Sequence, residues 1–542
     1  MAHHDKHDNV PNESREPVVE TTPSTETQPP PQIEPVPADA AVPEGILAGV
    51  NIPPTESSTV SEATTTATTN PLKKAGIATF DWLDMRLGIR STFVPLLVHT
   101  SPRVNWWYVF GSATLIAFVM QVVTGVALAF TYVPAPNSAN QSIQWITNEA
   151  PLGSVVRGIH YWGATAMVIL VFIHMCQVFA FGSFKFPREL NWLSGVVLLL
   201  LTISLAFTGQ LLRWDQDAYW AVYVMAEQLA RVPFIGNWLM QIIIAGQTVG
   251  GNTLTRFYAT HVFLLPAVTF ALIGTHLYLV IKHGISELPV VGKPVEPNTY
   301  HEQYHELLEE EGEPFWPDSA WKDVIAALLI GALVLALAIW PGPKHIGEIA
   351  NPTILQTSPR PDWYFLSLFA VLALMPPKLE DTLIVVGPLV MGLALILLPI
   401  LASKGERHWR RRPWALGIIA FTVVALGVLT YLGEQSAWSP DLTPKPLAAN
   451  ITQRADAAGL SRGAEIFQQN ACLNCHRIGD SGGSRGPDLS TVGDRLTQEQ
   501  LVWRILNGGT NMPAYGQTLG TSDVNQVVQF LLQQNSERSQ KP

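Results

Sequence analysis

The sequence predicts an all-α membrane protein that ends in a small, soluble, all-α domain. Hydrophobic residues make up 48 % of the 542 residues and charged residues only 14 %, whereas soluble domains carry about 25 % charged residues. The mean hydropathy is positive, at +0.20. Seven stretches are apolar over about 20 residues, the length that a helix needs to cross a bilayer. The formal charge of −10 comes with no basic segment of domain size, so we expect no nucleic-acid partner.

The seven predicted spans leave two shorter apolar stretches unassigned. Residues 234–246 and 365–375 are each about half a span long, so we expect interfacial or re-entrant helices there. The spans themselves are expected at 106–132, 159–181, 192–212, 258–281, 324–340, 382–402 and 413–432.

Lysine and arginine residues gather in the loops on one side of these spans. Such loops face the cytoplasm, which places the N-terminus on the inner side of a bacterial cytoplasmic membrane. Because seven is odd, the C-terminal domain is expected on the outer, periplasmic side. The basic residues concerned are Lys73, Lys74, Arg86, Arg90, Lys185, Arg188, Lys404, Arg407, Arg410, Arg411 and Arg412.

Four histidines lie inside predicted spans, where an ionisable residue suggests a function. His160 and His174 are fourteen residues apart on the second span, and His261 and His276 are fifteen apart on the fourth. Fourteen residues rise about 21 Å and return to within about 40° of the same helix face. One such histidine alone is more often a buried core residue. Two pairs at nearly equal spacing on facing helices would form two stacked bis-histidine sites, which suit two haem b groups.

Glycines repeat with the same spacing. Gly111 and Gly125 lie on the first span, and Gly195 and Gly209 lie on the third. Glycine lets a flat macrocycle approach a helix closely, although glycine is also common in membrane helices for packing alone. The shared spacing favours haem contact. Three arginines near helix ends could pair with haem propionates or anchor the helices at the interface, namely Arg157, Arg188 and Arg256.

The stretch ACLNCHRIG, at 471–479, contains a CxxCH motif, which is typical of covalent haem c attachment. Cys472 and Cys475 would form the thioethers, and His476 would bind the iron. Met512, in GGTNMPAYG, is the only methionine near this motif and is the expected second axial ligand. A zinc site or a redox-active cysteine pair is the alternative, but the chain has no second cysteine pair to complete a zinc site.

The region from about residue 80 to 432 resembles cytochrome b of the bc1/b6f family, the quinol:cytochrome c (or plastocyanin) oxidoreductases. RGIHYWGA, IHMCQV, FKFPRELNWLSG, TGQLLRWDQDAYWA, TLTRFYATHVFLLP and THLYLVIKHGIS resemble its four-helix haem core. EPFWPD, SPRPDWYF and RRPW resemble its three-helix subunit IV, and the fourteen-then-fifteen histidine spacing resembles the b6 branch. The order of elements around CxxCH is similar to class I cytochrome c.

This resemblance implies a domain organisation for the whole chain. A four-helix haem-binding bundle would occupy 71–290, a three-helix subunit IV-like part 291–434, and a class I cytochrome c domain 454–535. Residues 435–453 form a polar, proline-containing linker. Residues 1–70 are rich in Pro, Thr, Glu and Ser, which predicts a disordered tail, and 536–542 form a C-terminal tail.

PDWY, at 361–364, resembles the quinol-oxidation signature of the family, usually written PEWY. Asp362 stands where the family most often has glutamate, and a carboxylate there can accept a proton from quinol. Taken alone, PDWY could be a turn that opens a short helix. By resemblance the pocket also contains Pro361, Trp363, Tyr364, Tyr219 and Trp220.

Three positions depart from the family pattern. Val109 stands at or near the cysteine that holds an extra c-type haem in the b6 branch, so we expect no covalent third haem in the core. Arg213 stands where the family commonly has proline, in a loop that lines the oxidation pocket. Cys176, two residues from His174, is expected to be a small apolar filler.

By resemblance, the chain is the membrane subunit of a Q-cycle quinol:cytochrome c oxidoreductase that oxidises quinol at the outer face. Electrons would pass through two haem b groups and one haem c, protons would be released outside, and quinone would be reduced near His174, His276 and Lys282. The implied partners are a Rieske iron–sulfur protein, the membrane quinol pool, a c-type cytochrome or cupredoxin acceptor, and a second copy in a homodimer within a multi-subunit complex. Two alternatives are a haem b anchor subunit of a respiratory dehydrogenase and a non-enzymatic electron carrier or assembly scaffold.

Overall fold

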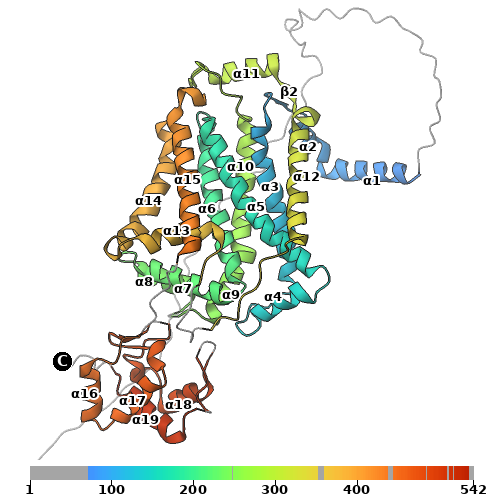
Figure 1. The fold of residues 1–542 in the computed structure, drawn as a ribbon. Coiled ribbons are helices and arrows are strands. Elements are labelled where there is room, and N and C mark those ends of the chain that lie inside the picture. The colour runs from blue at the N-terminus through green and yellow to red at the C-terminus, as the bar shows by residue number, and fades with distance from the viewer. Residues whose placement is uncertain are drawn as a thin grey trace, which may run out of the picture. The chain divides into compact units, whose positions relative to one another are not determined.

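The computed structural model describes residues 71–246, 248–351, 359–436, 444–483, 485–509, 512–516 and 518–535. The chain divides into two units, Met1–Ile77 and Ala78–Pro542, and only residues 71–77 of the first are described, as the start of α1 (Pro71–Leu87). The two predicted tails, 1–70 and 536–542, lie outside the described residues, as does 437–443 of the predicted linker. Nearly all the regular secondary structure of the described residues is helical, as predicted (Figure 1).

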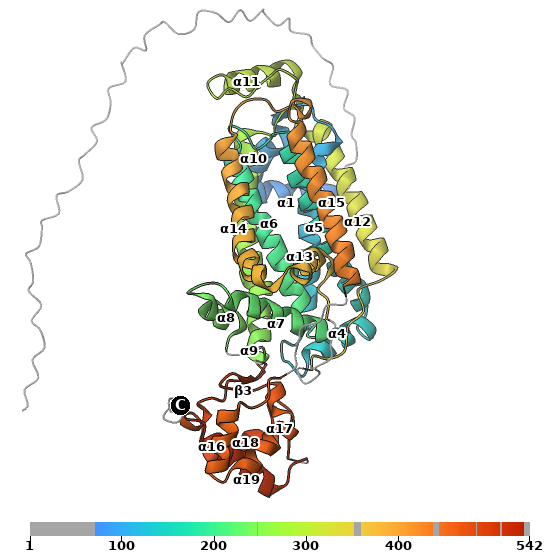
Figure 2. The same cartoon turned by 60° about the vertical axis from the view of Figure 1, so that its left-hand side comes forward.

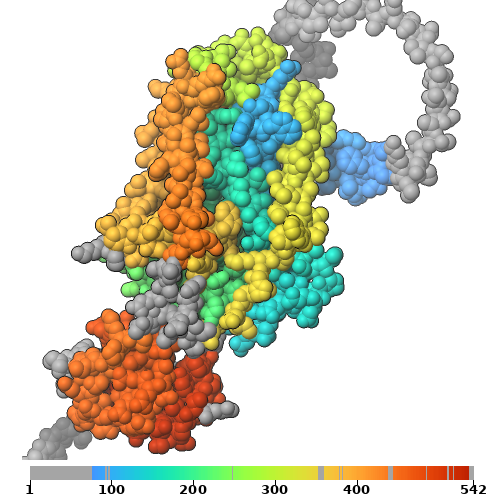
Figure 3. All heavy atoms as spheres, in the orientation of Figure 1, coloured from blue at the N-terminus to red at the C-terminus, as the bar shows by residue number. Residues whose placement is uncertain are grey.

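Seven helical segments are long and apolar enough to cross a membrane, which confirms the predicted number and position of the spans. The first three comprise a short 3-10 turn with α3 (Phe110–Ala129), then α5 (Gly153–Ala180) and α6 (Glu189–Leu211). Figure 3 shows α12 and α15 on one face of the bundle, with earlier helices visible between them. The remaining four segments are Gly251–His283, Phe315–Ile339 with α12 (Ala320–Ile339), Thr382–Leu401 within α14 (Pro377–Leu401), and α15 (Pro413–Gln435).

Short helices gather at the two ends of the bundle (Figures 1 and 2). The stretches expected to form half-length helices do so, as α8 (Gly236–Ile244) and α13 (Trp363–Leu374). Together with α4 (Ala139–Asn148) and α7 (Gln216–Ala230) they mark one end, here named the α13 end. The other end, the α11 end, carries α2 (Ile89–Val98) and α11 (Tyr300–Glu311).

Only two small strand pairs occur among the described residues. In the membrane part, β1 (Thr100–Ser101) pairs antiparallel with β2 (Glu313–Pro314), with Thr100 opposite Pro314. This pair joins the segment before the first span to the segment before the fifth. In the C-terminal part, β3 (Arg477–Ile478) pairs antiparallel with β4 (Ser481–Gly482) directly after the CxxCH motif.

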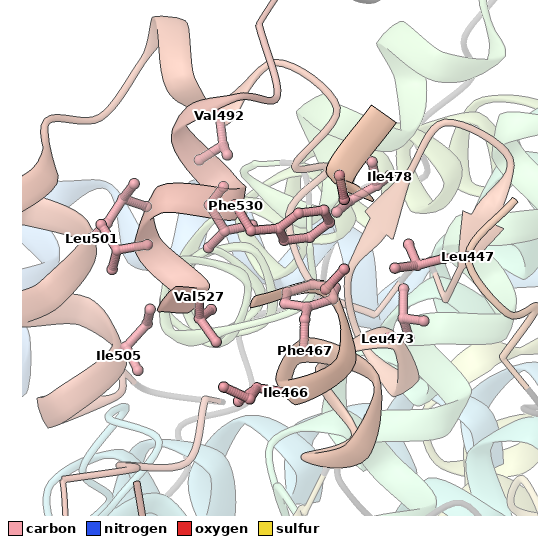
Figure 4. Packing of buried hydrophobic residues seen from close by; sticks show 14 of the residues in the cluster. Leu447, Ile466, Phe467, Leu473, Ile478, Val492, Leu501, Ile505, Val527 and Phe530 are labelled. Carbon is pink, nitrogen blue, oxygen red and sulfur yellow. The ribbon is translucent and has the colours of Figure 1, made fainter. Parts of the chain in front are cut away.

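The C-terminal part has its own hydrophobic core, which α17 (Ser461–Gln469) and α19 (Thr521–Leu532) build together (Figure 4). The rings of Phe467 and Phe530 contact each other in this core, with centroids 5.8 Å apart and planes tilted by 53°. A Cβ on Gly463 would collide with the backbone oxygen of Gln526, so glycine allows the two helices to approach closely. Two further helices complete this part, α16 (Ala449–Ala457) and α18 (Gln498–Asn507).

The core of this part begins before the predicted domain boundary. Leu447 and Ile451 belong to the buried cluster, and Lys445 forms a bridge to Gly482. Residues 445–453, which the sequence suggested as linker, therefore include the first part of α16 and one edge of the core.

Candidate functional site

The four membrane histidines lie on two of the long helical segments. His160 and His174 are on α5, and His276 is on α10 (Leu265–His283). His261 lies in a π-helical turn, Thr260–Leu264, between α9 (Gly251–Ala259) and α10. The imidazole rings of His160 and His261 come together with centroids 6.4 Å apart and planes at 80°.

The π-helical turn explains why the second histidine pair is one residue further apart than the first. A π turn accommodates one more residue than an α turn. The stretch between His261 and His276 contains the rest of this turn and the first part of α10, whereas His160 and His174 lie on an uninterrupted α-helix. Fifteen residues with one wide turn thus return to nearly the same face as fourteen residues without it.

Each of the four glycines predicted to contact haem lies against the ring of one histidine. The closest case is Gly209, where an added Cβ would lie 2.7 Å from Cε1 of His261. Such a contact would force the imidazole to move, so glycine is required for this ring position. In the other three pairs, the added Cβ would lie a little further from Cε1 of the histidine. These distances are 3.3 Å for Gly111 with His174, 3.2 Å for Gly125 with His160 and 3.6 Å for Gly195 with His276.

Hydroxyl groups orient three of the four histidines. The Nδ1 atoms of His160, His261 and His276 lie 2.9, 3.0 and 2.8 Å from the hydroxyl oxygens of Thr124, Thr208 and Ser194, respectively. Each hydroxyl donates to a backbone carbonyl of its own helix, so it accepts from Nδ1–H and leaves Nε2 free to bind a metal.

Sequence reasoning missed these hydroxyl residues, although a signal for them was present. Thr124, Ser194 and Thr208 each directly precede one of the glycines. The fourth glycine, Gly111, follows Phe110 instead, and Nδ1 of His174, the histidine beside it, has no hydrogen-bond partner among the described residues.

These features fit haem b at the His160–His261 site. The ring centroids of His160 and His261 are 6.4 Å apart. This separation leaves room for one metal ion between the rings, with a metal–imidazole bond of about 2 Å to each. His174 and His276 each lie against a glycine in the same way, and His276 also has a hydroxyl partner, Ser194. The residues are therefore suited to bind two bis-histidine haem groups.

The CxxCH motif has a similar arrangement in the C-terminal part. Cys472 opens a short 3-10 turn, Cys472–Asn474, and Cys475 follows it. Nδ1 of His476 donates to the carbonyl oxygen of Pro487 at 2.9 Å, which leaves Nε2 free. A Cβ on Gly486 would lie 2.8 Å from Cε1 of His476. Met512 and Cys472 both pack against the hydrophobic core of this part, so the donor set fits a covalently held haem c.

A cavity of about 600 Å³ lies beside the His160–His261 site. Its walls come from α6, α7, α8, α9, the π-helical turn, the start of α10, α13 and the residues just before α13, and most of its lining is apolar. Thr208 lines the cavity and also orients His261. Pro361 of PDWY and Trp220 line it as well, whereas Tyr219 is fully buried in a neighbouring core cluster. The structure thus brings one end of PDWY and one histidine site to the same cavity.

Asp362 is the N-cap residue of α13 and is 5 % exposed. Its Oδ1 lies 2.5 Å from Nζ of Lys344 and 3.4 Å from Nη1 of Arg213, and its Oδ2 accepts from the Tyr364 hydroxyl at 3.1 Å. Burial alone would raise the pKa of Asp362, but the charges of Arg213 and Lys344 outweigh burial and hold the pKa below its usual value. Asp362 is therefore held as an anion just outside the cavity.

The remaining predicted residues have other partners. Arg188 donates to the backbone oxygens of His283, Gly284 and Ile285 and to the Tyr300 hydroxyl, and Arg157 donates to the Thr147 hydroxyl and to the Lys344 backbone oxygen. These donors hold helix ends together. Trp363 is 36 % exposed and donates to the Thr165 hydroxyl at 3.5 Å. Arg256 donates to the Ile242 backbone oxygen and lines the cavity.

Comparison with known protein families divides the chain into three matched segments. Residues 96–284 match the family model "Cytochrome b/b6/petB", and residues 349–451 match "Cytochrome b(C-terminal)/b6/petD". Residues 458–531 match "Cytochrome C oxidase, cbb3-type, subunit III". These segments correspond to the haem core, the subunit IV-like part and the C-terminal part.

Individual proteins give the same result. Cytochrome b6 of Euglena gracilis is 39 % identical over 214 residues, which are 38 % of this chain and 97 % of that protein. Cytochrome b6 of Heliobacterium modesticaldum is 42 % identical over 210 residues, which are 38 % of this chain and 99 % of that protein. A solved structure described as a hyperthermophilic respiratory Complex III matches with a TM-score of 0.56 and 27 % identity, covering 71 % of this chain and 97 % of that one. The chain therefore belongs to the cytochrome b/b6 family and carries, in one polypeptide, a b6-like part, a subunit IV-like part and a C-terminal cytochrome c domain.

Proposed function

We propose that this chain oxidises quinol in the cavity at the α13 end, as the cytochrome b subunit of a Q-cycle quinol:acceptor oxidoreductase. The observation that carries the proposal is the double role of Thr208. Its side chain lines the cavity, and its hydroxyl lies 3.0 Å from Nδ1 of His261. A molecule in the cavity therefore lies one side chain away from a histidine suited to bind haem.

The cavity has the character that a quinol requires. Its volume of about 600 Å³ lies within the range of small-molecule sites, about 300–1,000 Å³. Apolar side chains such as Phe257, Phe365 and Phe369 can contact the ring and the isoprenoid chain, and a few polar groups, including Thr208, can contact the hydroxyls. Asp362 follows Pro361, which lines the cavity, and by resemblance to the family motif its carboxylate would accept a proton from quinol.

The protein's own residues divide the remaining tasks. The four membrane histidines would hold two haem b groups, and Cys472, Cys475, His476 and Met512 would hold one haem c. When bound, these groups supply one-electron transfer across the membrane and to the C-terminal domain. The proposal includes a Rieske-type iron–sulfur partner and a homodimeric complex in a bacterial cytoplasmic membrane. It also includes an outer position for the α13 end and the cytochrome c domain. The outer position rests on the charge bias of the loops.

The test is quinol-dependent reduction of a soluble c-type cytochrome by the complex purified from its native membrane. We expect activity that an inhibitor of the outer quinol site abolishes. An intact complex with both haem types but no such activity would overturn the proposal and favour an anchor subunit of a dehydrogenase.

Haem content provides an independent test of the cofactor assignment. Extraction and spectroscopy should give two haem b groups for each haem c, and a haem-stained denaturing gel should show one covalent haem on this chain. Cys475→Ala should remove the covalent signal and leave both haem b groups. A covalent signal that persists in this variant would contradict the assignment of the CxxCH motif.

A further inference from the structure

Two carboxylates lie near the cavity, and their surroundings differ. Asp362 is almost fully buried, is paired with Lys344 and Arg213, and is not among the residues that line the cavity. Asp217, on α7, lines the cavity and is only partly buried. It is the only carboxylate in the described lining.

Asp217 has one hydrogen-bond partner among the described residues. Its Oδ1 accepts from the backbone N–H of Arg360 at 3.3 Å. The guanidinium of Arg360 does not neutralise it, because that group donates to the backbone oxygens of Gly433 and Ser436. The second carboxylate oxygen of Asp217 thus remains available to a hydroxyl group in the cavity.

We propose that Asp217 is a catalytic carboxylate of the quinol site and accepts a proton directly from a quinol hydroxyl in the cavity. This inference rests on the proposed function. In this step an O–H bond of the quinol breaks, an O–H bond forms on the Asp217 carboxylate, and one electron leaves the quinol for the iron–sulfur partner. Asp217 then releases the proton to water, and the second proton and electron leave the quinol in a separate step.

The charges around Asp217 are consistent with a proton acceptor. Burial raises the pKa of Asp217 above its usual value, and the neighbouring charge of Asp215 acts in the same direction. The backbone N–H of Arg360 and the charges of Lys344 and Arg213 oppose this rise without cancelling it. A base is most effective when its pKa lies near the working pH, so the raised pKa makes Asp217 a better base than Asp362. The charged groups that face Asp217 or share its cavity are Asp215, Arg213, Arg256, Lys344 and Arg360.

The experiment compares Asp217→Asn with Asp217→Glu in the purified complex, with a short-chain quinol as the substrate. The asparagine retains an Oδ1 atom that accepts from Arg360 N–H, so it removes the base and keeps the hydrogen bond. Pre-steady-state haem b reduction should be slower by about tenfold or more in Asp217→Asn, and Asp217→Glu should restore most of the rate. Glu227→Gln removes a carboxylate from α7 outside the cavity lining and serves as the matched control, with the wild-type rate expected.

The pH profile separates a proton acceptor from a residue that only positions its neighbours. In the wild type the rate should rise with pH as Asp217 ionises, and this acidic limb should be absent in Asp217→Asn. A wild-type rate and an unchanged limb in Asp217→Asn would overturn the inference while leaving the proposed function intact. Absence of quinol oxidation in the wild type would instead overturn the proposed function itself.

Discussion

The two ends of the helical bundle bury charged side chains for different purposes. At the α11 end, Arg188 donates to three backbone oxygens at the end of α10, and Arg407 pairs with Glu287. At the α13 end, Asp362 is paired with Lys344 and Arg213, while Asp217 opens to a cavity. Buried charges are tolerated only when they are paired or hydrogen-bonded. The α11 end uses this pairing to fix helix ends, whereas the α13 end leaves one carboxylate for a ligand.

Removing one histidine at each end should give the largest effects and should separate the two ends. His261→Leu should reduce the haem b content from two to one and abolish quinol oxidation, because the lost group is the one beside the cavity. His276→Leu should also lose one haem b, yet quinol should still reduce the remaining haem b in a single turnover. Haem extraction and stopped-flow absorbance measure both outcomes, with His283→Leu as the control. Two haem b groups in His261→Leu would contradict the assignment.

Asp362→Asn should have the next largest effect. The amide leaves the charges of Lys344 and Arg213 unbalanced beside the cavity and cannot take up the second proton of the quinol, so quinol oxidation should fall by about 100-fold or more. Steady-state reduction of a c-type cytochrome measures the rate, and absorbance spectra should show unchanged haem content. Asp362→Glu, which restores the more common residue of the motif, should retain activity. Full activity in Asp362→Asn would remove this carboxylate from the proposed site.

At the α11 end, the corresponding change should affect stability more than the reaction. Arg188→Gln removes the charged donor from the backbone oxygens of His283, Gly284 and Ile285, at a cost of about 3 kcal/mol. Because large membrane complexes unfold irreversibly, the half-life of haem b absorbance at a fixed temperature is the suitable measure. Arg188→Lys keeps the charge, so its half-life of haem b absorbance should lie between those of Arg188→Gln and the wild type. A loss of quinol oxidation before any loss of haem would indicate a direct role for Arg188 instead.

The sequence predicted those features that depend on local spacing. The seven spans follow from apolar length, and the histidine and glycine pairs follow from helical periodicity. The hydroxyl partners of the histidines were also accessible, since Thr124, Ser194 and Thr208 directly precede glycines. The π-helical turn at His261 is not specified by the spacing of fifteen alone, because a regular α-helix also brings two residues fifteen apart near the same face.

The surroundings of Asp362 could not be predicted in this way. Arg213 lies 149 residues before Asp362 in the chain, and Lys344 lies in the loop that follows α12. Contacts between such distant segments depend on how the helices pack, which no local pattern records. The same holds for Asp217, whose position in α7 suggests only an acidic residue in the first turn of a helix. Its exposure to the cavity depends on α6, α8 and α13 as well.

The smallest predicted effect concerns Lys344, whose side chain is 32 % exposed, so that solvent screens its charge. The pKa of Asp362 is lowered in the folded protein, so the ion pair adds stability above the pKa of an unfolded aspartate, and this stability is lost as the pH falls through the folded-state pKa. Lys344→Met should therefore shorten the half-life of haem b absorbance at neutral pH, by the equivalent of about 1 kcal/mol or less.

The difference between Lys344→Met and the wild type should disappear in acid, where Asp362 is protonated in both proteins. Lys344→Arg, which keeps the charge, should match the wild type at every pH. A difference that persists unchanged in acid would show that Lys344 stabilises the α13 end through packing of its side chain and not through its charge. In that case the distinction between the ends would rest on the cavity and on Asp217 alone.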